Sequence, residues 1–196
     1  MSYLRAFAPW IVFALVPSAQ WKWAALFALL VSAVEIRRKT RAGLPLDAQI
    51  IELGTAVYFA GLTALAFADP GTALHAYIPA MAEGALGVIA LGSLLLRKPF
   101  TLGIARQSMP REAWDNPLFL RVNTIISTVW AASFVIGCVA LAALAHGSAT
   151  GRIVVQTAVF VLPLVFTTRY VEHVRARARA QERAQEHAQA GPAVAG

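Results

Sequence analysis

The chain has 196 residues, of which 58% are hydrophobic and 14% are charged, and its mean hydropathy is +0.61. Charged residues make up roughly a quarter of an average soluble domain, so this composition excludes an ordinary soluble protein. The net charge of +7 fits basic loops beside anionic lipid better than it fits a nucleic-acid partner.

The charges are clumped, and the apolar runs between the clumps approach the roughly 20 residues needed to cross a bilayer. The runs do not alternate apolar and polar residues with period two, which argues against a membrane β-barrel. The sequence therefore predicts an all-α, polytopic helical transmembrane bundle with about five full spans and a short N-terminal hydrophobic helix. We expect residues 1–175 to form its single domain and residues 176–196 an Ala/Arg-rich, partly disordered cytoplasmic tail.

The first apolar run, residues 6–17, is short and contains Pro9 and Pro17. We expect a helix that either spans with the help of its neighbour or lies partly embedded. The next residues, Trp21-Lys22-Trp23, fit an interfacial anchor with both indoles at headgroup level. The later runs cover residues 23–36, 48–68, 77–96, 118–145 and 152–170.

Two of the connections carry clear local signals. Asp69-Pro70-Gly71 predicts a turn after the third run. Asn116-Pro117 predicts a helix start, with Asn as the N-cap and Pro at the first helical position.

Basic residues alternate strictly with the predicted spans. Residues 37–41, residues 97–121 and the tail from Arg169 hold fourteen Lys and Arg residues, whereas the turns between them hold only Lys22 and Arg152. The positive-inside rule predicts that the two basic loops and the C-terminus are cytoplasmic. If the first helix also spans, the N-terminus with Arg5 is cytoplasmic too.

The longest loop, residues 97–121, is longer than a topology signal requires, although such a signal is its simplest explanation. Its apolar side chains interleave with Arg, so it can also lie in the membrane interface or dock a partner. These apolar residues are Phe100, Leu102, Ile104, Met109, Trp114 and Phe119. The candidates for partner or lipid contact are Arg97, Lys98, Arg106, Arg111 and Trp114, with Arg175, Arg179 and Arg183 in the tail.

The three tail arginines fall at i, i+4 spacing on one helical face. Like charges at that spacing disfavour an isolated helix, and anionic lipid would relieve the repulsion. A solvated helix end that acts as a stop-transfer signal explains the same pattern.

Glu83 lies about seven residues into its predicted span. An ionised carboxylate is costly there, so such residues usually face the bundle interior and are candidates for function. The alternative is a structural carboxyl group that is hydrogen-bonded to another helix, with Gln156 or Thr157 as its partner. The candidate binding residues are Glu83, Gln156, Asn123 and Glu52.

Other polar residues favour structural roles. Glu35 and Glu52 can pair with the basic cluster at 37–41 or with Arg121. A polar stripe at the start of the fifth run predicts interhelical hydrogen bonds. It consists of Asn123, Thr124, Ser127 and Thr128.

Small residues recur every four positions in the third and fourth runs and predict close helix contacts. They are Ala56, Ala60, Ala64 and Ala68, followed by Ala80 and Gly84. This pattern favours antiparallel pairing of the two spans or a homodimer face.

We expect no cofactor, no metal site and no enzymatic activity. The four histidines lie outside the spans, and no nucleotide-binding, zinc-protease or nucleophile motif is present. The single cysteine, Cys138, cannot form an internal disulfide and fits a small apolar residue within its span.

The order of elements resembles the intracellular septation protein A family of the bacterial inner membrane. The resemblance covers about residues 4–175 and rests on the opening LRAFAPWIVFAL, the basic exit at 37–41 and Lys98-Pro99. It continues with Pro110 and Trp114 in the loop and with Trp130, Phe134 and Gly137 in the next span. The chain departs from the family pattern where Asp115-Asn116-Pro117 looks inserted and where the tail is longer.

The resemblance implies a multi-pass envelope protein of the inner membrane that is linked to septation and cell-wall synthesis, without catalytic activity. Its expected partners are anionic lipids and other inner-membrane proteins, with the division or cell-wall machinery as candidates. A homo-oligomer is a further possibility. The rival hypothesis is a small transporter or lipid-handling protein that uses the carboxylate of Glu83.

Overall fold

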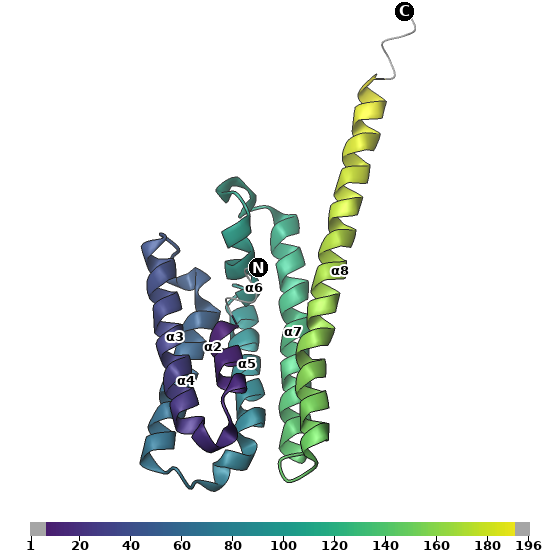
Figure 1. The fold of residues 1–196 in the computed structure, drawn as a ribbon. Coiled ribbons are helices and arrows are strands. Elements are labelled where there is room, and N and C mark those ends of the chain that lie inside the picture. The colour runs from purple at the N-terminus through teal and green to yellow at the C-terminus, as the bar shows by residue number, and fades with distance from the viewer. Residues whose placement is uncertain (1–6, 191–196) are drawn as a thin grey trace, which may run out of the picture.

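The computed structural model describes residues 7–190, which fold into helices joined by short turns (Figure 1). The α-helices are α2 (Ala8–Leu15), α3 (Trp21–Arg41), α4 (Ile50–Ala68), α5 (Ile78–Leu95), α6 (Phe100–Ala105), α7 (Pro117–Ala143) and α8 (Ala149–Ala190). The predicted all-α class is confirmed over this range. The expectations for Arg5 and for fraying from Gly191 onward lie outside the described residues.

Four helices of residues 7–190 are long and apolar enough to cross a membrane, where about five spans were predicted. They cover Ile50–Ala68, Ala73–Leu95, Pro117–Ala143 and Ala149–Gln185. The difference is α3, which has 21 residues but ends in the charged turns around Arg37, Arg38 and Lys39. Near the N-terminus the structure has the short helix α2, whose eight residues reach only about 12 Å, less than half of the hydrocarbon thickness.

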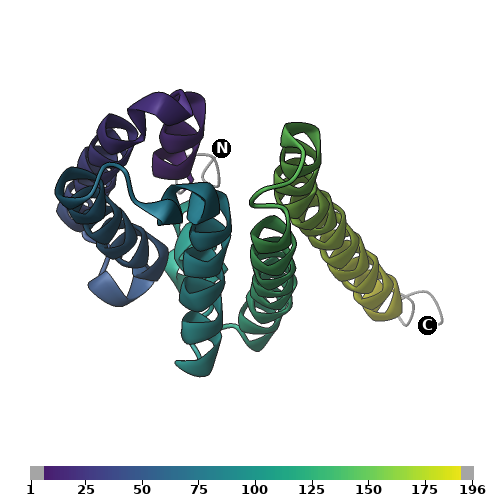
Figure 2. The ribbon, with the colours of Figure 1, turned by 90° about the horizontal axis from the view of Figure 1, so that it is seen from below.

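The long helices form a row in which each packs on its neighbour in the order α3, α4, α5, α7, α8. Seen along the helices, α5 lies between α4 and α7, and α8 is outermost on the α7 side (Figure 2). The α4–α5 and α7–α8 connections lie at one end, and α6 and the projecting part of α8 at the other (Figure 1). We call the latter the basic end, because it holds the basic segments at 37–41 and 97–121.

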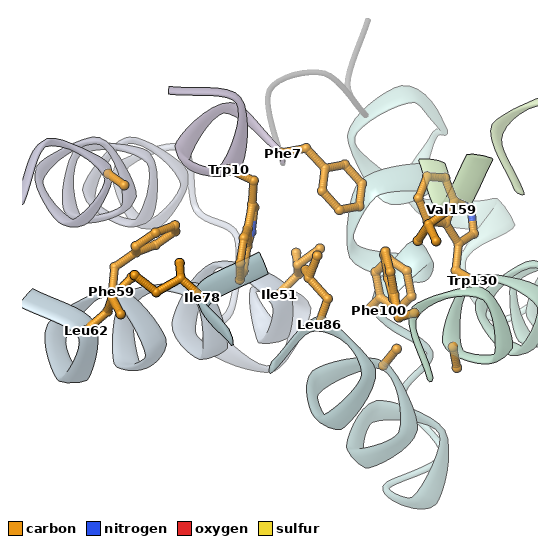
Figure 3. Close-up of a cluster of buried hydrophobic side chains, with 14 of the residues drawn as sticks. Phe7, Trp10, Ile51, Phe59, Leu62, Ile78, Leu86, Phe100, Trp130 and Val159 are labelled. Carbon is orange, nitrogen blue, oxygen red and sulfur yellow. The ribbon is translucent and has the colours of Figure 1, made fainter. Parts of the chain in front are cut away.

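Helix α2 and its N-cap residue Phe7 join the two halves of the row through two aromatic side chains (Figure 3). Phe7 stacks on Trp130 of α7 at 5.3 Å between ring centroids, and Trp10 stacks on Tyr58 of α4 at 5.1 Å. The indole Nε1 of Trp10 also donates a hydrogen bond to Thr55 Oγ1 at 3.1 Å. Stacked aromatic pairs contribute about 0.5–1.5 kcal/mol each beyond the burial of their area. The segment therefore stabilises the packing of α4 and α7 in one bundle.

Glycine allows α7 to approach its neighbours closely. A Cβ atom on Gly137 would lie 2.6 Å from Val159 Cγ2 of α8. A Cβ on Gly84 of α5 would lie 3.1 Å from the sulfur of Cys138. Gly84 therefore serves the α5–α7 contact.

The predicted pairing of the third and fourth spans through small residues is wrong for the α4 stripe. Ala60, Ala64 and Ala68 are exposed on the surface of α4, and Ala56 is half-buried. Helices α4 and α5 instead meet where Gly54 faces Ile89. Trp21 is buried against His75, whereas Trp23 is exposed, and the interfacial position expected for the two indoles stays a prediction.

Pro163 interrupts the hydrogen-bond ladder of α8, and α7 repairs the interruption. Proline has no N–H, so the carbonyl of Val159, four residues earlier, loses its helical partner. Ser133 Oγ of α7 donates to that carbonyl at 2.9 Å. One turn further on, Trp130 Nε1 donates to Thr167 Oγ1 at 3.1 Å, so two hydrogen bonds connect α7 to the least buried of the four candidate spans.

We predict that Ser133→Ala lowers the free energy of unfolding by about 1 kcal/mol, because it leaves the Val159 carbonyl unsatisfied in an apolar region. In a Pro163→Ala background residue 163 has its own N–H for that carbonyl, so the same substitution should cost only a few tenths of a kcal/mol. Reversible unfolding in bicelles measures this double-mutant cycle.

Ser32→Ala is the matched control, because the Ser32 hydroxyl donates to Ala28 O within its own helix and its loss leaves no carbonyl unpaired. An equal loss from Ser133→Ala in both backgrounds would contradict the repair.

Candidate functional site

Glu83 lies in the middle of α5 and points into the bundle. Its side chain is 3% exposed, and its Oε2 atom is buried without a hydrogen-bond partner among the described residues. It lies beside α7 at Gly137, where an added Cβ would be 3.5 Å from Glu83 Cγ. The predicted hydrogen bond to Gln156 or Thr157 is not formed, because both side chains lie on the less buried helix α8 without reaching the carboxyl group.

A second polar group in the same region also lacks a partner. The hydroxyl of Tyr58 on α4 is buried without a hydrogen bond among the described residues and lies within electrostatic reach of Glu83. Leaving a polar group unpaired in an apolar medium costs several kcal/mol. The pair can chemically accept a proton or bind a hydrogen-bonding group, but the surrounding core is tightly packed, with Leu86 and Phe134 almost fully buried.

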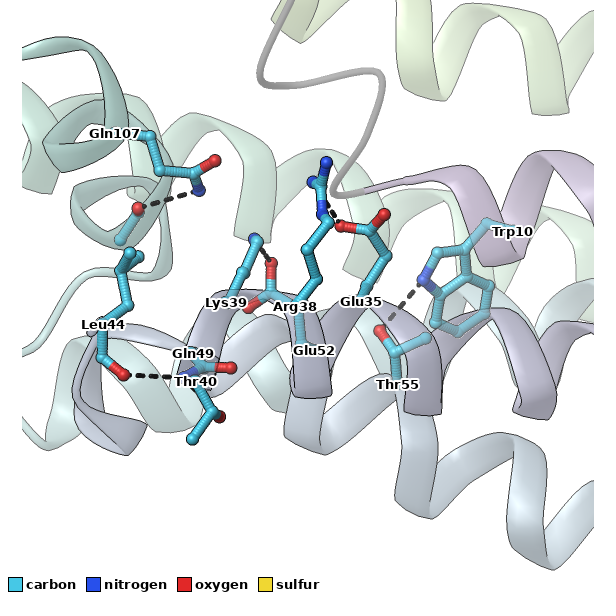
Figure 4. Close-up of polar contacts among 11 residues, drawn as sticks. Trp10, Glu35, Arg38, Lys39, Thr40, Leu44, Gln49, Glu52, Thr55 and Gln107 are labelled. Carbon is cyan, nitrogen blue, oxygen red and sulfur yellow. Dashed lines mark hydrogen bonds and ion pairs between the residues drawn. The ribbon is translucent and has the colours of Figure 1, made fainter. Parts of the chain in front are cut away.

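A separate polar cluster lies near the basic end, between α3 and α4 (Figure 4). Lys39 forms an ion pair with Glu52, and both side chains are about 5% exposed or less. Gln49 is fully buried and donates to Leu44 O at 2.9 Å. The predicted pairing of Glu52 with the 37–41 segment is confirmed, as is the pairing of Glu35, which binds Arg38 at 2.8 Å.

Helix α6 is inserted into the basic end and fills the space between α4 and α7. All residues from Phe100 to Ile104 are buried. Thr101 Oγ1 donates to the backbone oxygen of Asn123 at 3.0 Å and lies 2.8 Å from Ser127 Oγ, which confirms the interhelical role of Ser127 alone. The side chains of Asn123, Thr124 and Thr128 donate to carbonyls of their own helix instead. Lipid contact by Phe100, Leu102 and Ile104 is therefore an incorrect expectation, because the protein itself covers these side chains.

Gly103 determines how closely α6 can approach. A Cβ atom at this position would lie 2.0 Å from the backbone carbonyl oxygen of Ala48, in the short helix η2 (Leu46–Ala48). Gln107 then donates to Gly103 O at 3.2 Å, one turn further along. These two contacts fix the position of α6 and therefore the point from which the second half of the loop continues.

The second half of the loop carries an arginine–tryptophan cluster of Arg106, Arg111 and Trp114, of which Arg111 is exposed and the other two are half-buried. The two guanidinium carbons lie 4.9 Å and 5.7 Å from the same indole ring. Trp114 Nε1 donates to Met109 O at 3.2 Å, which fixes the ring. Neither arginine makes an ion pair with a described side chain, and Arg106 Nε is buried without a hydrogen-bond partner.

The structure does not bring the four candidate binding residues into one site. Glu83 lies in the core, Glu52 and Asn123 lie on opposite sides of α6, and Gln156 is half-buried on α8. Sequence reasoning missed Tyr58 and Thr101 as members of these clusters. The remaining contact candidates are exposed at the basic end or on the projecting helix and are Arg97, Lys98, Arg175, Arg179 and Arg183.

No protein-family model, curated protein or solved structure matches the chain. The resemblance to the septation family therefore stays a prediction. Within residues 7–190 there is also no group of three or more His, Cys, Asp or Glu side chains placed to hold a metal ion.

We predict that Gly103→Ala lowers the free energy of unfolding by about 2 kcal/mol or more, because α6 must move away from the Ala48 carbonyl. The displaced loop should also be cleaved faster by trypsin at Arg106 and Arg111. Thermal unfolding in detergent and timed proteolysis measure the two effects.

Gly92→Ala is the control, since nothing lies within 4 Å of an added Cβ there and alanine favours a helix. If both variants are equally stable and equally resistant to trypsin, α6 does not need the glycine.

Proposed function

We propose that this chain is a non-enzymatic protein of the bacterial inner membrane that supports septation or envelope integrity through contacts with other membrane proteins. The arginine–tryptophan cluster carries the proposal. Two guanidinium groups are held against one indole without a carboxylate of the described chain, so the acidic groups of a partner can complete their pairing. The inserted helix α6 supports this function, because it fixes the cluster before a partner arrives.

We also propose that α3 is a fifth span and that the basic end faces the cytoplasm. The 21 residues of α3 extend about 31 Å, which matches the hydrocarbon thickness. The helix runs alongside α4 from the Trp23–Phe67 contact to the Lys39–Glu52 pair, so the two helices cover the same depth. The excess of Lys and Arg at the basic end favours a cytoplasmic C-terminus.

We predict that Arg106→Glu/Arg111→Glu reduces the capture of division or cell-wall proteins by about tenfold, because the reversed charges repel acidic groups of the partner. Cross-linking in native membranes, followed by identification of the captured proteins, measures the loss. Membrane insertion should not change, since the other basic segments keep the orientation.

Arg179→Glu/Arg183→Glu makes the same charge change on the projecting part of α8 and serves as the control. Equal capture by the wild type and the loop variant would remove the proposal. An equal loss in both variants would show a general charge effect rather than recognition by the cluster.

A second candidate function follows from Glu83. A buried carboxyl group without a partner among the described residues, within electrostatic reach of an unpartnered tyrosine hydroxyl, supports a small transporter or lipid-handling protein that binds a proton or substrate there. This candidate requires the packed core to open, because the carboxyl group lies among buried side chains in the described structure.

We predict that Glu83→Gln abolishes function in this second case, although the protein still inserts and its free energy of unfolding is unchanged or higher. The neutral amide removes the cost of burying a charge. Rescue of a strain that lacks the gene gives the functional readout, and unfolding in bicelles gives the stability.

Glu112→Gln is the matched control, because Glu112 is exposed in the loop. Full rescue by Glu83→Gln would eliminate the carboxylate mechanism and leave Glu83 as a structural residue.

A further inference from the structure

A groove lies between α7 and α8 near the basic end. The two helices diverge toward this end (Figure 1). The volume of the groove is about 310 Å³. Val122 and Ile125 supply part of its apolar wall, while Arg121, His173 and Arg177 supply its cationic and polar side. None of the described lining residues is acidic, and neither arginine makes an ion pair with a described side chain.

The register of α7 and α8 brings the two arginines to the same height. The hydrogen bond from Trp130 to Thr167 fixes the antiparallel pair. Arg121 lies nine residues before Trp130 and Arg177 lies ten residues after Thr167. At 1.5 Å per residue, both stand about 14 Å beyond this hydrogen bond on the same side.

The same count relates the arginines to the bilayer. Helix α7 ends at Ala143, thirteen residues or about 20 Å on the other side of Trp130. If Ala143 marks one edge of a hydrocarbon layer about 30 Å thick, the opposite edge lies about 10 Å beyond the hydrogen bond. The two arginines then stand about 4 Å outside the hydrocarbon, within the headgroup layer.

We propose that this groove binds one anionic phospholipid of the adjoining leaflet. Arg121 and Arg177 bind the phosphate from two sides, and one acyl chain lies along Val122 and Ile125. Charge favours this occupant, because two unpaired guanidinium groups at headgroup height match a phosphodiester whose negative charge is not balanced by a cationic headgroup. The amphipathic wall favours a lipid over a free anion, which would leave the apolar half of the groove uncovered.

This site differs from a general attraction of the basic tail to membranes. Arg175 and Arg179 are exposed on the same helix but do not line the groove. The inference also stands apart from partner capture by the arginine–tryptophan cluster, which lies on the loop before α7.

The test is native mass spectrometry of the full chain in detergent, titrated with phosphatidylglycerol or with phosphatidylcholine. We expect one phosphatidylglycerol per chain to bind preferentially. Arg121→Gln/Arg177→Gln should weaken it by about thirtyfold, since each arginine near an anionic lipid contributes about fivefold. Arg175→Gln/Arg179→Gln, with the same charge change on the same helix, should stay within about twofold of the wild type.

Ala178→Trp tests the shape of the groove, because it fills the lining while both arginines remain. We expect it to lose the lipid as well. An equal loss in the 175/179 variant would overturn the proposal in favour of non-specific tail electrostatics.

Three other outcomes would also overturn it. Equal binding of phosphatidylcholine would show an apolar groove without headgroup selection. Displacement of the lipid by millimolar inorganic phosphate would show a simple anion site. A dimer that replaces the lipid-bound monomer would show that a second copy of the chain occupies the groove.

Discussion

A polar atom in the hydrocarbon layer has no water to bind, so the protein must supply its partner or bear the cost. This constraint explains the contact between α7 and α8. Proline at position 163 leaves the carbonyl of Val159 without its helical N–H, and the hydroxyl of Ser133 takes that place. Helix α8, the least buried of the four candidate spans, is held by hydrogen bonds in addition to apolar packing, which has little driving force in lipid.

The same constraint separates the buried carboxylates into two kinds. Glu52 has a cation of its own in Lys39, and removing either partner would leave an uncompensated charge in a buried place. Glu83 has no such partner among the described residues, and the hydroxyl of Tyr58 is also without one. Buried groups that the fold leaves unsatisfied are costly, and in membrane proteins they commonly mark function. The contrast is why Glu83, and not Glu52, carries the second candidate function.

The sequence predicted the elements that local signals specify. Apolar run lengths located the long helices, and the Asn116 side chain caps α7 as predicted, accepting from Leu118 N at 2.8 Å. The insertion of α6 could not be predicted, because it depends on Gly103 meeting the Ala48 carbonyl, a contact between segments 55 residues apart. The alanine stripe of α4 failed for a related reason, since alanine suits a lipid-facing and a protein-facing surface alike. The absence of a hydrogen-bond partner for Glu83 among the described residues could not be predicted either, because it depends on which side chains of other helices the fold places near it.

The positive-inside rule predicts the orientation of the protein from its basic residues, but it does not predict which of them can bind a partner or a lipid. The positive-inside rule treats the cations at the basic end as equivalent, and for orientation they are. The fold makes them different: Lys39 is buried with a carboxylate, whereas Arg106 and Arg111 share one indole. Arg121 and Arg177 instead face a groove that no acidic side chain lines. Only cations left without an internal counter-charge can recognise an external anion, so burial and pairing, rather than the number of charges, separate the binding candidates from the orientation signal.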